Sequence, residues 1–134
     1  MLKVFTDGGS RGNPGKAASA FTAYEDGKEI YFEKKYLGIN TNNFAEYYAV
    51  LIALQYIVGS TKYKKIDFFS DSELMVRQLN GIYKIKNQTL YEMADKIKKL
   101  IIEKNLIVKF NHVLRSENKR ADELVNKALD ETTL

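Results

Sequence analysis

Four acidic residues stand at positions that could bring carboxylates together for metal binding. Asp7 ends a segment with the apolar alternation of a strand, and Asp71 directly follows another such segment, KIDFFS. Glu46 lies in the first turns of a strongly apolar helical segment, and Asp122 begins a later helix beside an inward-facing alanine. A carboxylate at the margin of an apolar face is stabilised by pairing with a cation or by coordinating a metal. These positions indicate a candidate site for divalent cations.

Each of these acids also has a simpler structural explanation, which spacing alone leaves open. The chain carries 17 Asp and Glu residues, so a group of four is easily selected. Asp71 and Glu46 can stabilise the start of a helix by interacting with its dipole. Asp7 can be a turn residue, because the stretch TDGGSRGNPG is rich in glycine and contains the only proline.

The residue composition narrows the metal chemistry. The sequence has no cysteine and one histidine, which excludes a disulfide framework and a thiolate site such as structural zinc. Any bound metal is then held mainly by oxygen, which favours Mg²⁺, with Mn²⁺ as a substitute. The net charge of +4, from 21 Lys and Arg against 17 Asp and Glu, suits a polyanionic partner without proving one.

The chain length and the residue composition also predict the class of protein. A length of 134 residues is that of one domain, so we expect residues 1–134 to form a single unit. Apolar residues make up 45% and charged residues 28%, as in a soluble globular chain. No apolar run approaches the roughly 20 residues needed to cross a bilayer, and the pattern of a signal peptide is missing. We therefore expect a cytoplasmic monomer with no membrane association and no obligate protein partner.

Apolar periodicity predicts the elements that position the acids. Alternation predicts strands at residues 2–6, 16–25, 29–37, 65–70 and 106–113. Helical spacing predicts helices at residues 41–58, at about 72–79, from Thr89 onward and from about Ser116 onward. The last helix is expected to place Ala121, Leu124, Val125, Ala128 and Leu129 inward.

Short turn and capping signals separate these elements. Asp26-Gly27 predicts a tight turn between the second and third strands. Thr41 is a candidate N-cap for the first helix. Thr89 followed by Glu92 predicts a capping box for the longer helix that begins there.

The order of these elements, βββαβααβα, predicts an α/β fold. Three strands with short connections form an antiparallel meander, while strands that follow helices return by crossovers and can lie parallel to the first. We expect a mixed five-stranded sheet with helices on both faces. If the first and fourth strands are parallel neighbours, Asp7 and Asp71 emerge at the same edge, where open α/β sheets place ligand sites.

Four sequence blocks, in this order, carry a resemblance to a known family. They are FTDGGSRGNPG, TNNFAEYYAVLIAL, FFSDSELMV and ENKRADELVNKAL. With them the chain resembles ribonuclease HI, the type 1 ribonuclease H family, over essentially all of its length. The resemblance implies the ribonuclease H-like fold in a short form, without the basic protrusion of longer relatives and without an N-terminal hybrid-binding domain.

The resemblance implies a reaction and its catalytic acids. Asp7, Glu46, Asp71 and Asp122 match the family's metal-binding residues, with Asp7 shared by two Mg²⁺ ions about 4 Å apart. The implied reaction is hydrolysis of the RNA strand of RNA/DNA hybrids, which leaves 5′-phosphate and 3′-hydroxyl ends. Charge repulsion fits this independently, because closely packed carboxylates need cations or protons to offset it.

The resemblance also implies contacts with the hybrid duplex. The implied substrate-binding residues are Gly8, Ser10, Asn13, Thr41, Asn42, Asn43, Tyr83, Lys84, Lys86 and Arg115. Glycine lets a backbone approach a sugar-phosphate chain, and amides can read 2′-hydroxyls and base edges without carrying charge. A helix N-terminus can hold a phosphate of the DNA strand, and an aromatic residue with lysines can form a wall beside that strand.

Several of these residues have structural alternatives. Asn13 can be a turn residue, Asn42 or Asn43 can cap the first helix, and Thr41 can act simply as its N-cap. Tyr83 can pack on its own domain.

His112 is a candidate catalytic residue that departs from the family pattern. It lies ten residues before Asp122, where many relatives carry a histidine that assists with protons or product release. Here the segment HVLRSENKRAD lacks the usual glycine, and His112 alternates in phase with Val108 and Phe110, as at the end of a strand. A structural role is the alternative, and Arg115 could then meet phosphate in its place.

The sequence is compatible with three functions. The first is hydrolysis of the RNA strand of hybrids, and the second is a broader duplex specificity that includes RNA/RNA. The third is a nucleic-acid-binding module without catalysis. The presence of all four acids argues against the third, because clustered negative charge does not help to bind a polyanion.

Overall fold

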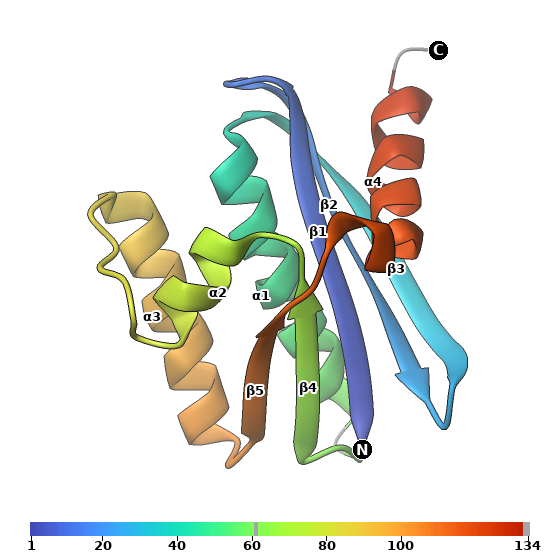
Figure 1. Cartoon of the computed structure of the whole chain (residues 1–134), viewed down its shortest axis with the longest axis vertical. Coiled ribbons are helices and arrows are strands. Elements are labelled where there is room, and N and C mark those ends of the chain that lie inside the picture. The colour runs from blue at the N-terminus through green and yellow to red at the C-terminus, as the bar shows by residue number, and fades with distance from the viewer. Residues whose placement is uncertain (61, 133–134) are drawn as a thin grey trace.

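Within the described residues, 1–60 and 62–132 of a computed structural model, five strands form one sheet with helices on both faces (Figure 1). The elements are β1 (Leu2–Gly12), β2 (Gly15–Glu25), β3 (Lys28–Asn40), α1 (Asn42–Ser60), β4 (Lys65–Ser70), α2 (Glu73–Leu79), α3 (Gln88–Glu103), β5 (Ile107–His112) and α4 (Lys119–Glu131). A short 3-10 turn, Arg115–Glu117, precedes α4. This is the predicted order, and the predicted fold class is confirmed.

The strand order in the sheet is β3-β2-β1-β4-β5. The first three strands pair antiparallel, and β4 pairs parallel both with β1 and with β5. Asp26 and Gly27 have positive φ angles of 51° and 77°, as a tight hairpin turn requires. Because Phe5 pairs with Phe69 in parallel register, β4 ends beside the middle of β1, which brings Asp71 next to Asp7.

Strand β1 is longer than predicted. The alternation indicated a strand that ends at Thr6, but pairing with β2 continues to Gly12, opposite Gly15. Asp7 therefore lies inside a strand rather than in a turn. The glycine-rich stretch stays extended because the second strand satisfies its backbone hydrogen-bonding groups.

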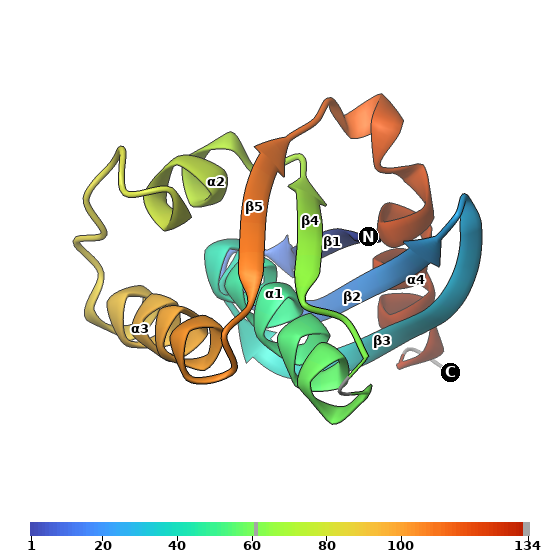
Figure 2. The ribbon, with the colours of Figure 1, turned by 90° about the horizontal axis from the view of Figure 1, so that it is seen from below.

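Two apolar layers hold the helices against the sheet. The larger core joins one face of the sheet to α1, α2 and α3 and contains Leu2, Phe21, Tyr47, Phe68 and Ile97. The smaller core lies between β2 and α4, on the opposite face (Figure 2). All the residues predicted to face inward on the last helix are buried.

The N-termini of three helices can be compared with the capping residues predicted from the sequence. The Thr41 hydroxyl accepts a hydrogen bond from the Phe44 amide at 3.1 Å, which confirms Thr41 as the N-cap of α1. The predicted capping box at Thr89 is wrong, because α3 begins earlier and Asn87 accepts from the Leu90 amide at 3.1 Å. The last helix also begins later than expected, at Lys119, since a 3-10 turn occupies the segment before it.

Membrane insertion through a helix has no support in the part of the chain that the structure describes. None of its helices combines the length and the apolar character needed to cross a bilayer.

Candidate active site

Three carboxylates from three different parts of the chain meet where β4 ends beside the middle of β1. Asp7 comes from β1, Asp71 directly follows β4, and Glu46 comes from the second turn of α1. One oxygen of each lies within 4.8 Å of the others. Parallel pairing of β1 with β4 brings the two aspartates together, as predicted, and α1 adds the glutamate.

Gly8 allows α1 to bring Glu46 this close to Asp7. A Cβ atom on Gly8 would lie 2.2 Å from the carbonyl carbon of Ala45 and 2.4 Å from the amide nitrogen of Glu46. The buried Ser19 hydroxyl donates to the Ala45 carbonyl at 2.6 Å and fixes the same contact. The sequence prediction explained this glycine by the approach of a sugar-phosphate chain. The structure adds a second reason, because the backbone of α1 fills the space where a Cβ atom would lie, while Gly8 also lines the cleft.

Burial and mutual repulsion favour the protonated forms of these acids. Asp7 is 9% exposed, and its burial, followed by the charges of Asp71, Asp122 and Glu46, raises its pKa to about 8. Burial raises the pKa of Glu46 to about 7, with a smaller contribution from the charge of Asp71 and an opposing hydrogen bond from Ser72. Burial also raises the pKa of Asp71, against the opposing charge of Arg115. Such a site gains stability when divalent cations offset the clustered charge.

Asp122 is close to this group but does not join it as tightly. Among the described residues, the set of carboxylates within 4.8 Å of one another contains Asp7, Glu46 and Asp71 only. The charge of Asp122 nevertheless raises the pKa of Asp7 and of Asp71. The Arg115 guanidinium lies 3.7 Å from its carboxylate, and the Asn126 side chain donates to its backbone carbonyl at 3.1 Å.

A cleft of about 360 Å³ opens above the acids. The predicted site residues that line it are Asp7, Gly8, Ser10, Asn42, Glu46, Asp71, Arg115 and Asp122. The Ser10 hydroxyl is buried and has no hydrogen-bond partner among the described residues. Arg11 and Asn126 also line the cleft, and the sequence analysis missed both. Arg11 follows a predicted substrate residue directly, whereas nothing in the sequence marks Asn126.

A second groove, of about 290 Å³, holds most of the predicted amide residues. It is lined by Asn13, Asn40, Thr41, Asn43, Phe44, Asn87, Thr89 and Leu90. Asn87 was missed because Thr89 was interpreted as the cap of the following helix. The groove presents several amide groups beside the N-terminus of α1, an arrangement that suits hydroxyl and phosphate oxygens.

Asn13 and Asn42 also have structural partners. The Asn42 amide donates to the Asn13 side chain at 3.0 Å, so Asn13 caps α1 from the turn after β1. The Ser10 amide donates in turn to the Asn42 side chain at 3.3 Å. These bonds hold the β1–β2 hairpin against α1. They agree in part with the structural roles that the sequence left open for these two residues. The side-chain NH₂ groups of Asn13 and Asn42 can still donate to a ligand.

Tyr83 and Lys84 lie in a different groove, with Tyr91 and Lys98. Tyr83 is exposed, and the Arg77 guanidinium lies 5.5 Å from the centroid of its ring. It therefore contacts its own domain and also presents a free ring surface. Lys86 is exposed nearby.

His112 is the last residue of β5 and pairs with Ser70, which precedes Asp71. The predicted strand end is confirmed, and the side chain is exposed. The positive form of His112 lowers the pKa of Asp71, the smallest of the effects on that acid. A catalytic role for His112 stays a prediction.

Asn118 is a buried residue that the sequence analysis missed. It precedes α4 and donates from Nδ2 to the Thr6 carbonyl at 2.9 Å, one residue before Asp7. The only signal in the sequence is an Asn four residues before Asp122, at a helix start.

Comparison with known proteins places this geometry in a family. The family model described as reverse transcriptase-like matches residues 5–128. The chain belongs to the reverse transcriptase-like family. This family model covers every acid of the cleft.

Relatives support the resemblance to ribonuclease HI. Ribonuclease HI of Halobacterium salinarum is 34% identical over 97% of this chain and 65% of its own length. Bifunctional protein Rv2228c of Mycobacterium tuberculosis is 36% identical over 95% of this chain and 35% of its own length. The chain thus spans between about a third and two thirds of these curated relatives.

Solved structures agree with this result. LC11-RNase H1, in complex with an RNA/DNA hybrid, has a TM-score of 0.95 and 38% identity, with 100% of both chains covered. RNase H1 from Halobacterium salinarum has a TM-score of 0.90 and 33% identity, with 97% of this chain and 98% of that one covered. The predicted resemblance to ribonuclease HI is confirmed.

Proposed function

We propose that this chain is a metal-dependent endoribonuclease that hydrolyses the RNA strand of RNA/DNA hybrids and leaves 5′-phosphate and 3′-hydroxyl ends. The observation that carries the proposal is the group of Asp7, Glu46 and Asp71 oxygens within 4.8 Å of one another, at the base of an open cleft. Similarity to LC11-RNase H1, whose structure contains an RNA/DNA hybrid, supports this choice of substrate.

The donor set fits Mg²⁺. All its members are carboxylates, and burial raises the pKa values of Asp7 and Glu46 to about 8 and 7, so the site favours added positive charge. Asp7, Glu46, Asp71 and Asp122 would hold the metal, with Asp7 central. When bound, two Mg²⁺ ions supply electrostatic stabilisation of the attacking and leaving oxygens of an in-line displacement.

Residues around the acids are suited to bind the hybrid. Arg115 lines the cleft, and its guanidinium can meet a phosphate near the acids. Ser10 lines the same cleft and is kept as a candidate contact for this strand. The groove of Asn13, Thr41 and Asn43 can receive sugar hydroxyls of the RNA strand and a phosphate of the DNA strand.

Further residues extend this surface. Gly8 and Asn42 line the same cleft as the acids. Tyr83, Lys84 and Lys86 would contact the DNA strand farther away through stacking and charge. We keep His112 as a candidate proton carrier at the edge of the site. A single domain over residues 1–134, a monomeric state and a cytoplasmic location stay predictions from the sequence.

Cleavage of matched labelled substrates tests the proposal. The purified chain is incubated with an RNA/DNA hybrid, the same RNA as a single strand and the same RNA in an RNA/RNA duplex, with Mg²⁺ or with a chelator. We expect products from the hybrid only, in Mg²⁺ only, with 5′-phosphate ends. Equal cleavage of RNA/RNA would indicate the broader specificity. Binding without products in any metal would indicate a non-catalytic module and would overturn the proposal.

A further inference from the structure

The position of Asp122 depends on how α4 sits on the sheet. Asp7 pairs with Ala20 in the sheet and Asp71 directly follows β4, whereas Asp122 lies in the first turn of α4. Its side chain is 34% exposed. A small rotation or shift of α4 would therefore move this carboxylate relative to the other acids without disturbing them.

The apolar contact beneath α4 holds the helix on the sheet, but its sheet side is made of small side chains. On the sheet side it consists of Ala18 and Ala20, and on the helix side of Leu124, Val125, Ala128 and Leu129. Alanine methyl groups form a shallow surface, so side chains of the helix interlock with it less than with large neighbours. Polar contacts at the helix start can then decide its placement.

One of these polar contacts is a single hydrogen bond between Asn118 and β1. Asn118 is 1% exposed and donates to the Thr6 carbonyl of β1 at 2.9 Å. This bond ties the start of α4 to β1 at one point, and by itself it does not set the rotation of the helix.

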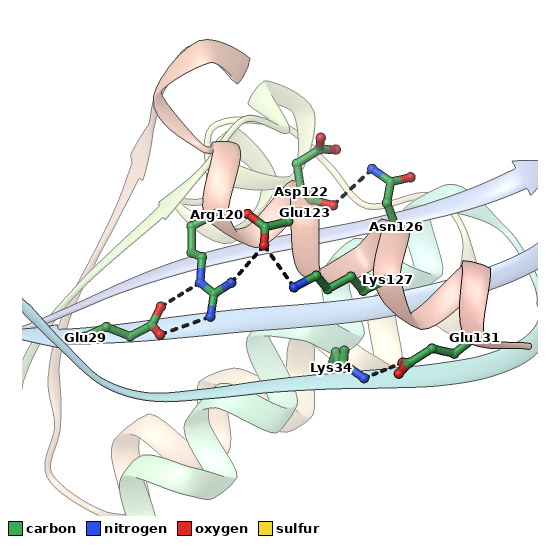
Figure 3. A network of polar contacts seen from close by, with 8 residues as sticks. All are labelled: Glu29, Lys34, Arg120, Asp122, Glu123, Asn126, Lys127 and Glu131. Carbon is green, nitrogen blue, oxygen red and sulfur yellow. Dashed lines mark hydrogen bonds and ion pairs between the residues drawn. The ribbon is translucent and has the colours of Figure 1, made fainter.

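Arg120 supplies a second and more directional contact (Figure 3). Its Nε and Nη2 donate to the two carboxylate oxygens of Glu29 at 2.8 and 3.1 Å. The guanidinium also lies 4.9 Å from the centroid of the Phe32 ring. The buried Thr22 hydroxyl donates to Glu29 at 2.6 Å and fixes the acceptor. A planar bidentate pair sets orientation as well as distance.

The two side chains leave α4 in different directions. Figure 3 shows Arg120 reaching towards Glu29 on β3 and the Asp122 carboxylate pointing away from that pair. Successive helical residues are about 100° apart, so two residues place them on nearly opposite sides of the helix. Arg120 therefore points away from Asp122 and can set its position through the helix backbone.

We propose that Arg120 and Glu29 are positioning residues, whose bidentate contact holds α4 in the orientation that brings Asp122 to the other three acids for metal binding. This inference rests on the proposed function. It concerns a contact between α4 and β3 that touches neither metal nor substrate.

The other end of α4 offers a matched control. Lys34 of β3 forms an ion pair with Glu131, which also joins α4 to β3 (Figure 3). Glu131 is nine residues beyond Asp122, about 13 Å along the helix axis. Loss of the Lys34–Glu131 pair also removes an ion pair between α4 and β3, but one that lies far from Asp122.

The experiment compares Arg120→Lys and Glu29→Gln with the control Glu131→Gln. Lysine keeps the charge of Arg120 but cannot form the planar pair, and glutamine removes the negative charge of Glu29. For each variant, calorimetry measures Mn²⁺ binding, and hybrid cleavage gives the Mg²⁺ concentration at half-maximal rate. Thermal unfolding, followed by circular dichroism, reports stability and sets an assay temperature at which every variant is folded.

We expect Arg120→Lys and Glu29→Gln to weaken Mn²⁺ binding and to raise the Mg²⁺ requirement by about tenfold. Glu131→Gln should keep the wild-type metal dependence, with a comparable change in melting temperature. The same metal dependence in all three variants would overturn the positioning role, while wild-type cleavage leaves the proposed function intact. A wild-type protein that neither binds Mn²⁺ nor cleaves would contradict the proposed function itself.

Discussion

The backbone of Gly8 lies so close to that of Ala45 that a Cβ atom on Gly8 would be 2.2 Å from the Ala45 carbonyl carbon. This contact joins β1 to α1 at the point where Asp7 and Glu46 face each other. The fold therefore stabilises the approach of two like charges through backbone packing. The same contact makes this position intolerant of any side chain.

Substitution of Gly8 by alanine tests this contact. The added methyl group would meet backbone atoms, which cannot move aside as a flexible side chain can. We expect Gly8→Ala to lower the free energy of unfolding by about 3 kcal/mol and to abolish metal-dependent cleavage. Thermal or urea unfolding, followed by circular dichroism, measures the change.

Gly59 provides the matched control, because nothing lies within 4 Å of a Cβ atom built on it. It lies near the end of α1, so Gly59→Ala should be neutral or stabilising, by up to about 1 kcal/mol. A Gly8→Ala protein as stable as the Gly59→Ala protein would show that the close approach of Gly8 to Ala45 does not contribute to the free energy of unfolding.

The raised pKa of Asp7 predicts how stability varies with pH in metal-free protein. The folded-state pKa is about 8 against an ordinary value of 3.8, so between these values the folded state binds more protons than the unfolded state. The free energy of unfolding must then fall as the pH rises through that window. From pH 5 to pH 8 this group should remove as much as about 4 kcal/mol.

The variant Asp7→Asn lacks this titration. In chelator, its stability relative to the wild type should increase between pH 5 and pH 8, and added Mg²⁺ should stabilise the wild type more than the variant. Urea unfolding at several pH values provides the measurement. Parallel stability curves for the two proteins would mean that Asp7 is not buried in a cluster of like charge.

Removal of Arg115 should affect substrate binding more than stability. Its side chain is 82% exposed and lies 3.7 Å from Asp122, so the ion pair contributes little to folding. We expect Arg115→Ala to raise KM for the hybrid, to reduce the salt dependence of binding by about one phosphate contact and to change the melting temperature little.

Lys99→Ala is the control for this charge change, because Lys99 pairs with Asp95 on α3, away from the acids. It should leave KM and the salt dependence as in the wild type. Equal effects of the two substitutions would assign the change to net charge and not to the position of Arg115.

Much of the site could be predicted because it depends on strand order. Parallel pairing of the strands that carry Asp7 and precede Asp71 follows from the crossover connection, and it alone brings these acids to one edge. The reason for Gly8 could not be predicted, since it depends on the distance between β1 and a helix formed by residues far along the chain.

Residues outside the regular pattern were harder to predict. Asn87 was missed because Thr89 and Glu92 match a capping motif, yet the helix begins two residues earlier. The support of Asp122 depends on contacts of α4 with β1 and β3, made by Asn118 and Arg120. Sequence periodicity identifies the buried face of that helix but not its placement on the sheet.

We infer that carboxylates from distant parts of the chain form one metal-dependent catalytic site, and Asp71→Asn tests this claim most directly. The measurement is the single-turnover rate of cleavage of a labelled RNA/DNA hybrid in Mg²⁺, together with the melting temperature. We expect a rate about 10³-fold below that of the wild type, equivalent to roughly 4 kcal/mol of lost transition-state stabilisation, in a folded protein. A folded Asp71→Asn protein that cleaves as fast as the wild type would contradict the claim.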